Sequence, residues 1–375
     1  MENWVANDVI AFLVALLLAG IIIPQILLIS FRKKLFDEVD ERKIHKGVVP
    51  RLGGIAFFPS ILFAFSLVIG FNLKYFGWET AGIYFEVVVP FYFMMCAVLL
   101  MFLVGIADDL LGVRYIAKFV VQIIASVLIV FSGIYIDNFF GLFWIKEIPD
   151  WIGWICTAFM VVYVVNAINL IDGIDGLASG LSTVAFIFYA IFFYYAGEFA
   201  YSLLASASAG TLLPFFYYNV FGDAKKQKKI FMGDTGALTT GMILIFLGLA
   251  MLHIGSDNVL ENYNPVILGI SPLLIPLFDV VRVYLHRVGR HKNPFLPDKS
   301  HIHHKLLALG LNQRLALIII VLWSMTFMII NLLLSPYINP TFIILGDIFI
   351  WILANVALSR SIVKREKRIG QKLFD

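Results

Sequence analysis

The chain of 375 residues alternates between long apolar stretches and short polar connections. A helix that rises 1.5 Å per residue needs about 20 apolar residues to cross roughly 30 Å of hydrocarbon. Runs of about that length predict eleven transmembrane helices, at about 9–31, 51–70, 87–106, 116–134, 151–168, 178–196, 201–219, 236–254, 264–281, 315–334 and 341–359. The pattern therefore predicts an all-α polytopic integral membrane protein.

Composition and the placement of charge support this class and orient the chain. The sequence is 61% hydrophobic and 14% charged, whereas soluble domains carry about 25% charged residues. Of its 28 lysines and arginines, 26 fall in every second connection or in the C-terminal tail, and only Lys74 and Lys146 fall in the other connections. By the positive-inside rule, the N-terminus is predicted outside and the C-terminus in the cytoplasm.

We expect a single membrane domain over residues 1–359, followed by a basic cytoplasmic tail at 360–375 that anchors to anionic lipid. Cys96 and Cys156 lie inside apolar runs and are interpreted as small buried residues, not as a disulfide or metal ligands. The unusual polar clusters all fall on the predicted cytoplasmic side, in connections at 32–50, 107–118, 169–177, 220–235 and 282–314.

Two of these clusters combine charge with helix ends. Basic residues including Lys46 precede a Pro and a Gly pair, which suits an anionic ligand such as phosphate, although an ordinary positive-inside loop would look the same. Asp108 and Asp109 stand at the end of the third run, where acids oppose the helix macrodipole unless a cation lies nearby. We interpret this acidic pair, followed by Lys118, as functional, with one carboxylate available as a base.

Two further clusters surround the sixth and eighth runs. Asn169, Asp172 and Asp175 belong to a polar stretch inside apolar sequence, which is either a site or a plain Asp-Gly turn. Asp172 and Asp175 would share a face if this stretch were helical. Beyond Asn219 and a lysine-rich patch, Asp234 stands between glycines at a helix start. This pattern suits a Mg²⁺ ligand beside phosphates, and a helix N-cap is the alternative.

The longest connection carries Arg282 and three closely spaced histidines, His301, His303 and His304. A zinc site would need further well-placed ligands, and none is evident. Cationic and imidazole donors fit pyrophosphate recognition better. Taken together, the clusters indicate phosphoryl transfer between a soluble nucleotide compound and a membrane lipid. The rival classes are an ion-coupled transporter, which predicts mid-helix acids and inverted repeats, and a non-catalytic scaffold.

Five motifs in order resemble one family, the polyprenyl-phosphate N-acetylhexosamine-1-phosphate transferases (glycosyltransferase 4 family), and within it the bacterial undecaprenyl-phosphate N-acetylglucosamine-1-phosphate transferases. The motifs are R-K-x-H-x-x-x-V-P-R-x-G-G at Arg42–Gly54, the pair Asp108-Asp109, N-L-I-D-G-I-D-G-L at Asn169–Leu177, F-M-G-D-x-G at Phe231–Gly236 and H-I-H-H at His301–His304. The resemblance implies transfer of N-acetylglucosamine 1-phosphate from UDP-GlcNAc to undecaprenyl phosphate, with release of UMP, at the cytoplasmic face of a bacterial inner membrane. The product would initiate a cell-surface polysaccharide.

Roles for individual residues follow from the same resemblance. Asp234 is expected to bind Mg²⁺, with Mn²⁺ as the alternative ion, and Asp108 or Asp109 to deprotonate or position the lipid phosphate. Lys118 would hold a phosphate, and His301 would act at the diphosphate. Nucleotide and sugar contacts are expected from Lys46, Asn169, Asp172, Asp175, Asn219, Phe231, Arg282, His303 and His304.

The donor and the assembly are less specified. The lysine-rich insert between Asn219 and Asp234 and the H-I-H-H form favour a simple UDP-N-acetylhexosamine, including fucosamine or quinovosamine forms, over UDP-MurNAc-pentapeptide. The expected partners are the donor, the acceptor lipid and the membrane, without nucleic acid, and the resemblance suggests a homodimer.

Overall fold

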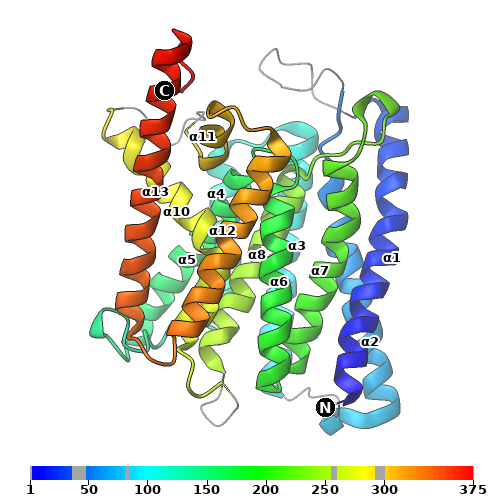
Figure 1. Cartoon of the computed structure of the whole chain (residues 1–375). Coiled ribbons are helices and arrows are strands. Elements are labelled where there is room, and N and C mark those ends of the chain that lie inside the picture. The colour runs from blue at the N-terminus through cyan, green and yellow to red at the C-terminus, as the bar shows by residue number, and fades with distance from the viewer. Residues whose placement is uncertain (1, 36–47, 81–84, 255–259, 292–299, 375) are drawn as a thin grey trace.

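The computed structural model describes residues 2–35, 48–80, 85–254, 260–291 and 300–374, and over them the protein is a bundle of helices (Figure 1). The long helices are α1 (Glu2–Lys33), α2 (Phe57–Thr80), α3 (Phe85–Leu111), α4 (Tyr115–Phe131), α5 (Asp150–Ile171), α6 (Leu177–Ala196), α7 (Phe199–Val220), α8 (Gly233–Ala250), α10 (Leu274–Val288), α12 (Gln313–Leu334) and α13 (Pro340–Ile369). Two more are short, α9 (Pro265–Ile270) and α11 (Ile302–Ala308). Single 3₁₀ turns are η1 (Gly53–Ala56), η2 (Leu142–Trp144), η3 (Ala224–Lys226), η4 (Met251–His253) and η5 (Ser271–Leu273).

Every apolar run identified in the sequence is helical, which confirms the all-helical, multi-pass membrane class. Within the described residues, 10 helical segments are long and apolar enough to cross a membrane, and α4, with 17 residues, is shorter. The two termini lie at opposite ends of the bundle, as an odd number of crossings requires (Figure 1).

The ninth apolar run is divided, because its sequence contains a helix breaker. Pro272 lies in η5, which separates α9 from α10, and proline has no N–H to continue an α-helical ladder. The carbonyl of Gly269, just before this break, accepts a hydrogen bond of 2.6 Å from the Tyr189 hydroxyl. The break is therefore held by α6.

Two segments expected as connection or tail are helical. The last helix does not stop near residue 359 but continues to Ile369, and Gly370, with φ of 75°, ends it. The chain then turns back, so that the backbone N–H groups of Leu373 and Phe374 donate to Glu366 at 2.7 and 2.9 Å. The long connection between α10 and α12 contains α11, which begins within the H-I-H-H motif.

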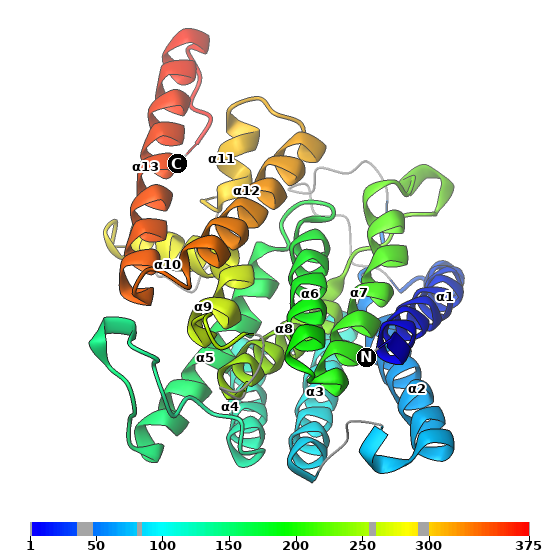
Figure 2. The same ribbon diagram turned by 60° about the horizontal axis from the view of Figure 1, so that its bottom comes forward.

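The central element is α8, because 94% of its apolar membrane-spanning window is buried inside the protein. It packs against α3 and α5, and it lies inside the bundle when the bottom of the molecule is turned forward (Figure 2). Its first turn is tightly enclosed: a Cβ at Gly54 would lie 2.0 Å from the Gly236 nitrogen, and one at Gly105 would lie 2.4 Å from the Thr235 Cα. These small residues let the backbones approach closely, and they fix where the start of α8 stands.

Candidate active site

A cluster of two carboxylates and one ammonium group lies where α3, α4 and α8 meet. Lys118 Nζ, from α4, is 2.7 Å from Asp234 Oδ2 on α8 and 3.2 Å from Asp108 Oδ2 on α3. The side chain of Asn169, on α5, lies within hydrogen-bonding reach of Asp234. Four helices therefore each contribute one polar side chain, and all four residues are half-buried. The cation that the acidic pair required is Lys118.

The neighbouring acid, Asp109, has a different environment from Asp108. Its Oδ1 accepts the backbone N–H of Asp234 at 2.8 Å, and its Oδ2 accepts both the N–H of Thr235 at 2.9 Å and the Thr235 hydroxyl at 2.6 Å. Asp109 thus satisfies the free N–H groups at the start of α8 from outside that helix. The alternative interpretation of Asp234 as an N-cap is wrong, since its carboxylate faces Lys118 and the cap role belongs to Asp109.

This division predicts different outcomes for the two adjacent acids. Asp109→Asn places an amide NH₂ against N–H donors and is expected to cost about 2–3 kcal/mol of stability, as for a charged hydrogen bond lost in a buried place. In the native protein, Asp108 Oδ1 accepts the Val113 N–H at 2.7 Å, and the side-chain oxygen of Asp108→Asn can still accept it. This variant is therefore expected to lose less than about 1 kcal/mol of stability. Thermal unfolding of both variants in detergent tests this, and equal losses of melting temperature would contradict it.

The segment from Asp172 to Gly176 is not helical, so the condition under which Asp172 and Asp175 would share a helical face is not met. Asp175 instead pairs with Lys229, whose Nζ lies 2.6 Å from its Oδ2. Asn219 holds the segment in place: its Oδ1 accepts the Gly176 N–H at 2.6 Å, and its Nδ2 donates to the Ile230 carbonyl at 2.8 Å. The structure therefore gives Asn219, which is 4% exposed, a positioning role between two motifs.

Asp172 follows the last residue of α5, and its carboxyl interacts with the charges of several acids and of Arg51. Burial, followed by the charges of Asp175 and Asp234, raises the pKa of the Asp172 carboxyl to about 7. Because this pKa lies above that of an unfolded aspartate, the folded state retains the proton longer, and the free energy of unfolding falls as the pH rises from about 4 to 7.

Asp172→Asn is therefore expected to stabilise the protein selectively at high pH. The gain should be about 2–4 kcal/mol above pH 7 and should shrink toward zero near pH 4, where the native carboxyl is protonated. Melting temperatures of variant and native protein across this range measure it, with Asp137→Asn, an exposed acid at the other end of the bundle, as the matched control. A difference that does not change with pH would contradict the assignment.

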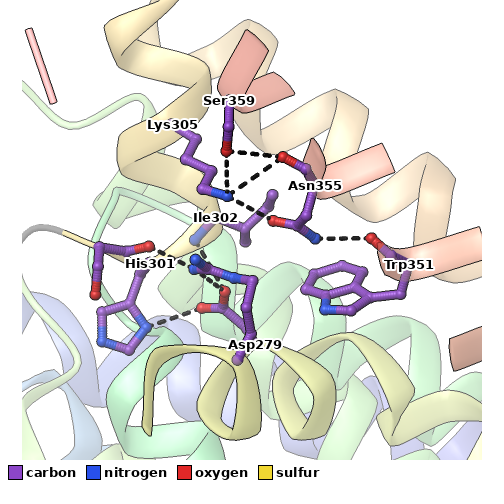
Figure 3. A network of polar contacts seen from close by, with 9 residues as sticks. Asp279, His301, Ile302, Lys305, Trp351, Asn355 and Ser359 are labelled. Carbon is purple, nitrogen blue, oxygen red and sulfur yellow. Dashed lines mark hydrogen bonds and ion pairs between the residues drawn. The ribbon is translucent and has the colours of Figure 1, made fainter. Parts of the chain in front are cut away.

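The histidine motif is organised by a buried acid that the sequence reading did not single out, Asp279 of α10. Its Oδ2 is 2.8 Å from His301 Nδ1, and its Oδ1 accepts the Ile302 N–H at 3.0 Å and an Arg282 Nη2 donor at 2.8 Å (Figure 3). Asp279 is fully buried. One feature of the sequence could have indicated Asp279. It is an acid within an apolar run, and it stands three residues before an arginine, a spacing that places both on one helical face.

His303 connects this motif to the aspartate segment. A Cβ at Gly173 would lie 2.1 Å from His303 Nε2, so the imidazole packs directly against the backbone between Asp172 and Ile174. The side chain is 1% exposed, and neither ring nitrogen has a hydrogen-bond partner among the described residues. Burial, then the nearby His304, lowers the pKa of His303 to about 3, so this imidazole is neutral at physiological pH.

The remaining predicted residues are placed as follows. The backbone of Phe231 pairs with the first motif, since its N–H donates to the Pro50 carbonyl at 2.9 Å and its carbonyl accepts from the Gly53 N–H at 3.0 Å, while its side chain is half-buried. His304 lies with its ring centroid 4.3 Å from that of His303. Lys46 lies outside the described residues. All five motifs except the N-terminal part of the first are thus brought to one end of the bundle.

The cluster suits a divalent cation that shares its coordination with a substrate. Over the described part of the chain, no three His, Cys, Asp or Glu side chains are grouped as ligands of a metal ion. Asp234 and Asp108, with Asn169 nearby, nevertheless offer the oxygen ligands that Mg²⁺ prefers. Mg²⁺ commonly takes only one or two protein carboxylates and completes its shell with phosphate oxygens and water.

A helical membrane bundle with such a cluster at one end defines a membrane-embedded group-transfer enzyme, and comparison with known proteins agrees. The family model "Glycosyl transferase family 4" matches residues 91–252. A "Probable undecaprenyl-phosphate N-acetylglucosaminyl 1-phosphate transferase" of Bacillus subtilis is 31% identical over 95% of this chain and 94% of that protein. The chain belongs to glycosyl transferase family 4, which confirms the family expected from the motifs.

Two other relatives carry a closely similar name, "Undecaprenyl-phosphate alpha-N-acetylglucosaminyl 1-phosphate transferase". The protein from Haemophilus influenzae is 30% identical over 90% of this chain and 92% of its own length. The protein from Yersinia pestis is 29% identical over 78% of this chain and 75% of its own length.

Proposed function

We propose that the protein transfers N-acetylglucosamine 1-phosphate from UDP-GlcNAc to undecaprenyl phosphate, releasing UMP and forming the lipid-diphospho-sugar that initiates a cell-surface polysaccharide. The observation that carries this proposal is the cluster of Asp108, Lys118 and Asp234 at the end of a membrane bundle. Phosphoryl transfer requires mainly positioning and charge compensation, and this cluster of carboxylates and an ammonium group can supply both. The names of the relatives support the two substrates.

In the proposed reaction, an oxygen of the lipid phosphate forms a bond to the β-phosphorus of the donor, the bond from that phosphorus to the bridging oxygen breaks, and UMP leaves. Asp108 is the acid placed to position or deprotonate the lipid phosphate, since Asp109 is committed to the start of α8. Lys118 supplies positive charge between the two carboxylates. Mg²⁺, or Mn²⁺ in its place, would be held by Asp234 with Asp108 and would neutralise phosphate charge.

The other site residues are proposed to bind the donor. Arg282 and His301, both ordered by Asp279, would contact the diphosphate, and His303, held against Gly173, would contact the sugar or the phosphate beside it. The Phe231 ring would stack on uracil, and Asp175 would also contact the nucleotide. The buried Asn219 would act by holding the two segments that carry these residues.

The orientation is part of this proposal. Eleven crossings, counting the shorter α4, would place the N-terminus outside and the C-terminus in the cytoplasm. The end of the bundle that carries α11 also carries the C-terminus, so the site would face the cytoplasm of a bacterial inner membrane (Figure 1). A homodimer remains a prediction from the family resemblance.

The test is UMP release by protein purified in detergent, with undecaprenyl phosphate, Mg²⁺ and a panel of donors. UDP-GlcNAc, the UDP-N-acetylfucosamine and quinovosamine forms, and UDP-MurNAc-pentapeptide are compared at equal concentration. UDP-GlcNAc is expected to give the highest kcat/KM, and omission of either the lipid or Mg²⁺ is expected to abolish release. Preference for another donor would replace the proposed sugar, and no UMP with any donor would overturn the proposed reaction.

A further inference from the structure

A lysine next to the histidine motif is buried between two helices. Lys305, on α11, is 5% exposed, and its ammonium group points to α13 (Figure 3). Its Nζ lies 3.0 Å from Asn355 Oδ1, 3.1 Å from Ser359 Oγ and 3.5 Å from the Asn355 carbonyl. An ammonium group has three donors, and three oxygens of α13 receive them.

The acceptors are all neutral, which distinguishes this contact from an ion pair. A buried charge is costly unless hydrogen bonds replace its water, and an apolar residue of similar volume would pack between two helices at less cost. Burial, then the charge of Arg282, lowers the pKa of Lys305 to about 8. Such a contact fixes the orientation and register of α11 against α13 more than it stabilises the fold, because only one placement of α11 satisfies all three donors.

The helix that carries Lys305 depends on tertiary contacts for its stability. α11 has seven residues, too few to be stable without tertiary contacts. Asp279 of α10 fixes its start through His301 and the Ile302 N–H, and Lys305 fixes it one turn later from the opposite partner, α13. His301 and Lys305 are four residues apart, so a shift at Lys305 is transmitted directly to His301.

We propose that Lys305 is a positioning residue for the reaction: with Asn355 and Ser359 it forms a cradle that sets the placement of α11 and so aims His301 and His303 at the donor. This inference rests on the proposed function, in which those histidines contact the donor. It assigns a role to α13, which lies outside the residues 91–252 matched by the family model.

The first test compares Lys305→Met, which keeps the length of the side chain and removes the donors, with Asn355→Leu, which removes the acceptor. Each is expected to lower kcat/KM about 10- to 100-fold, since displacement of a catalytic group by about 1 Å can cost 10²-fold. The matched control is Lys364→Met, an exposed lysine on α13, which is expected to stay within about twofold of the native protein.

A second test separates positioning from general destabilisation. If Lys305 acts through His301 and His303, then Lys305→Met is expected to slow the His301→Ala variant much less than it slows the native protein, because part of the function that Lys305 supports has already been removed. Losses that multiply in full in the double variant would overturn the proposal, as would native kinetics in Lys305→Met. The same conclusion would follow if the loss in Lys305→Met tracked a matching loss of folded protein, measured by its melting curve.

A third measurement does not depend on activity. Hydrogen exchange of the native protein is expected to show protected amides in α11, and Lys305→Met to lose that protection in α11 while α8 keeps it. Unchanged protection in α11 would overturn the proposed anchoring. Failure of the native protein to release UMP would instead overturn the proposed reaction and leave the exchange result to decide the anchoring.

Discussion

Asp234→Asn is expected to lower the rate of UMP release about 10²- to 10³-fold without unfolding the protein. The amide has the same shape as the carboxylate, but it removes the negative charge that faces Lys118 at 2.7 Å and that would bind Mg²⁺. The backbone N–H of residue 234 still donates to Asp109, so the start of α8 stays in place. Release of UMP by the purified variant, at saturating donor and lipid, measures the effect.

The control for this variant is Asp137→Asn, which removes an exposed acid in the connection between α4 and α5 at the other end of the bundle. It is expected to keep native kinetics and a native melting temperature. Full activity in Asp234→Asn would refute the assignment of Asp234 to the metal and to the reacting phosphates. A large fall in melting temperature would show that the residue acts through folding instead.

Gly105→Ala is expected to destabilise the packing of α3 against α8 strongly. The new Cβ would lie 2.4 Å from the Thr235 Cα and 2.7 Å from its nitrogen, and both are backbone atoms that cannot rotate away. The helices α3 and α8 would have to separate, which breaks the hydrogen bonds of Asp109 one turn further along α3. We expect a cost of about 3 kcal/mol or more, together with loss of activity.

Gly70→Ala provides the matched comparison, since it makes the same change in α2, where a Cβ would meet nothing within 4 Å. Alanine is the better helix former, so this variant is expected to be neutral or slightly more stable. Detergent-solubilised yield and thermal unfolding of the two variants give the measurement. Similar behaviour of the two would show that the close approach of α3 and α8 does not limit stability.

Much of the fold was predictable because the bilayer imposes a simple rule on sequence. Apolar residues must persist over the length of a spanning helix, and that requirement is visible in each run. The exceptions have local reasons. Pro272 divides one run into α9 and α10, and α13 continues to Ile369, where Glu366 in its charged final turns accepts a hydrogen bond from the backbone of Leu373.

The site was predictable as a set of residues but not as a set of roles. Asp108 and Asp109 are adjacent and identical in the sequence, yet one faces Lys118 and the other the start of α8. Asp279 was not singled out, because its contacts with His301 and with the Ile302 N–H form only when α11 folds over it. The same holds for Lys305, whose acceptors are 50 and 54 residues further along the chain.

The sequence by itself determined the membrane class, the family and the polar residues that carry the chemistry, because hydropathy and motif order are properties of the chain read in one dimension. The tertiary structure decided which side chains meet and which of them are left for substrates. The physical reason is that hydrogen bonds and ion pairs act over about 3 Å, and distances on that scale are set by how helices pack. Gly54 and Gly105 set that packing at α8, and they thereby decide that Asp234 faces Lys118 and that Asp109 does not.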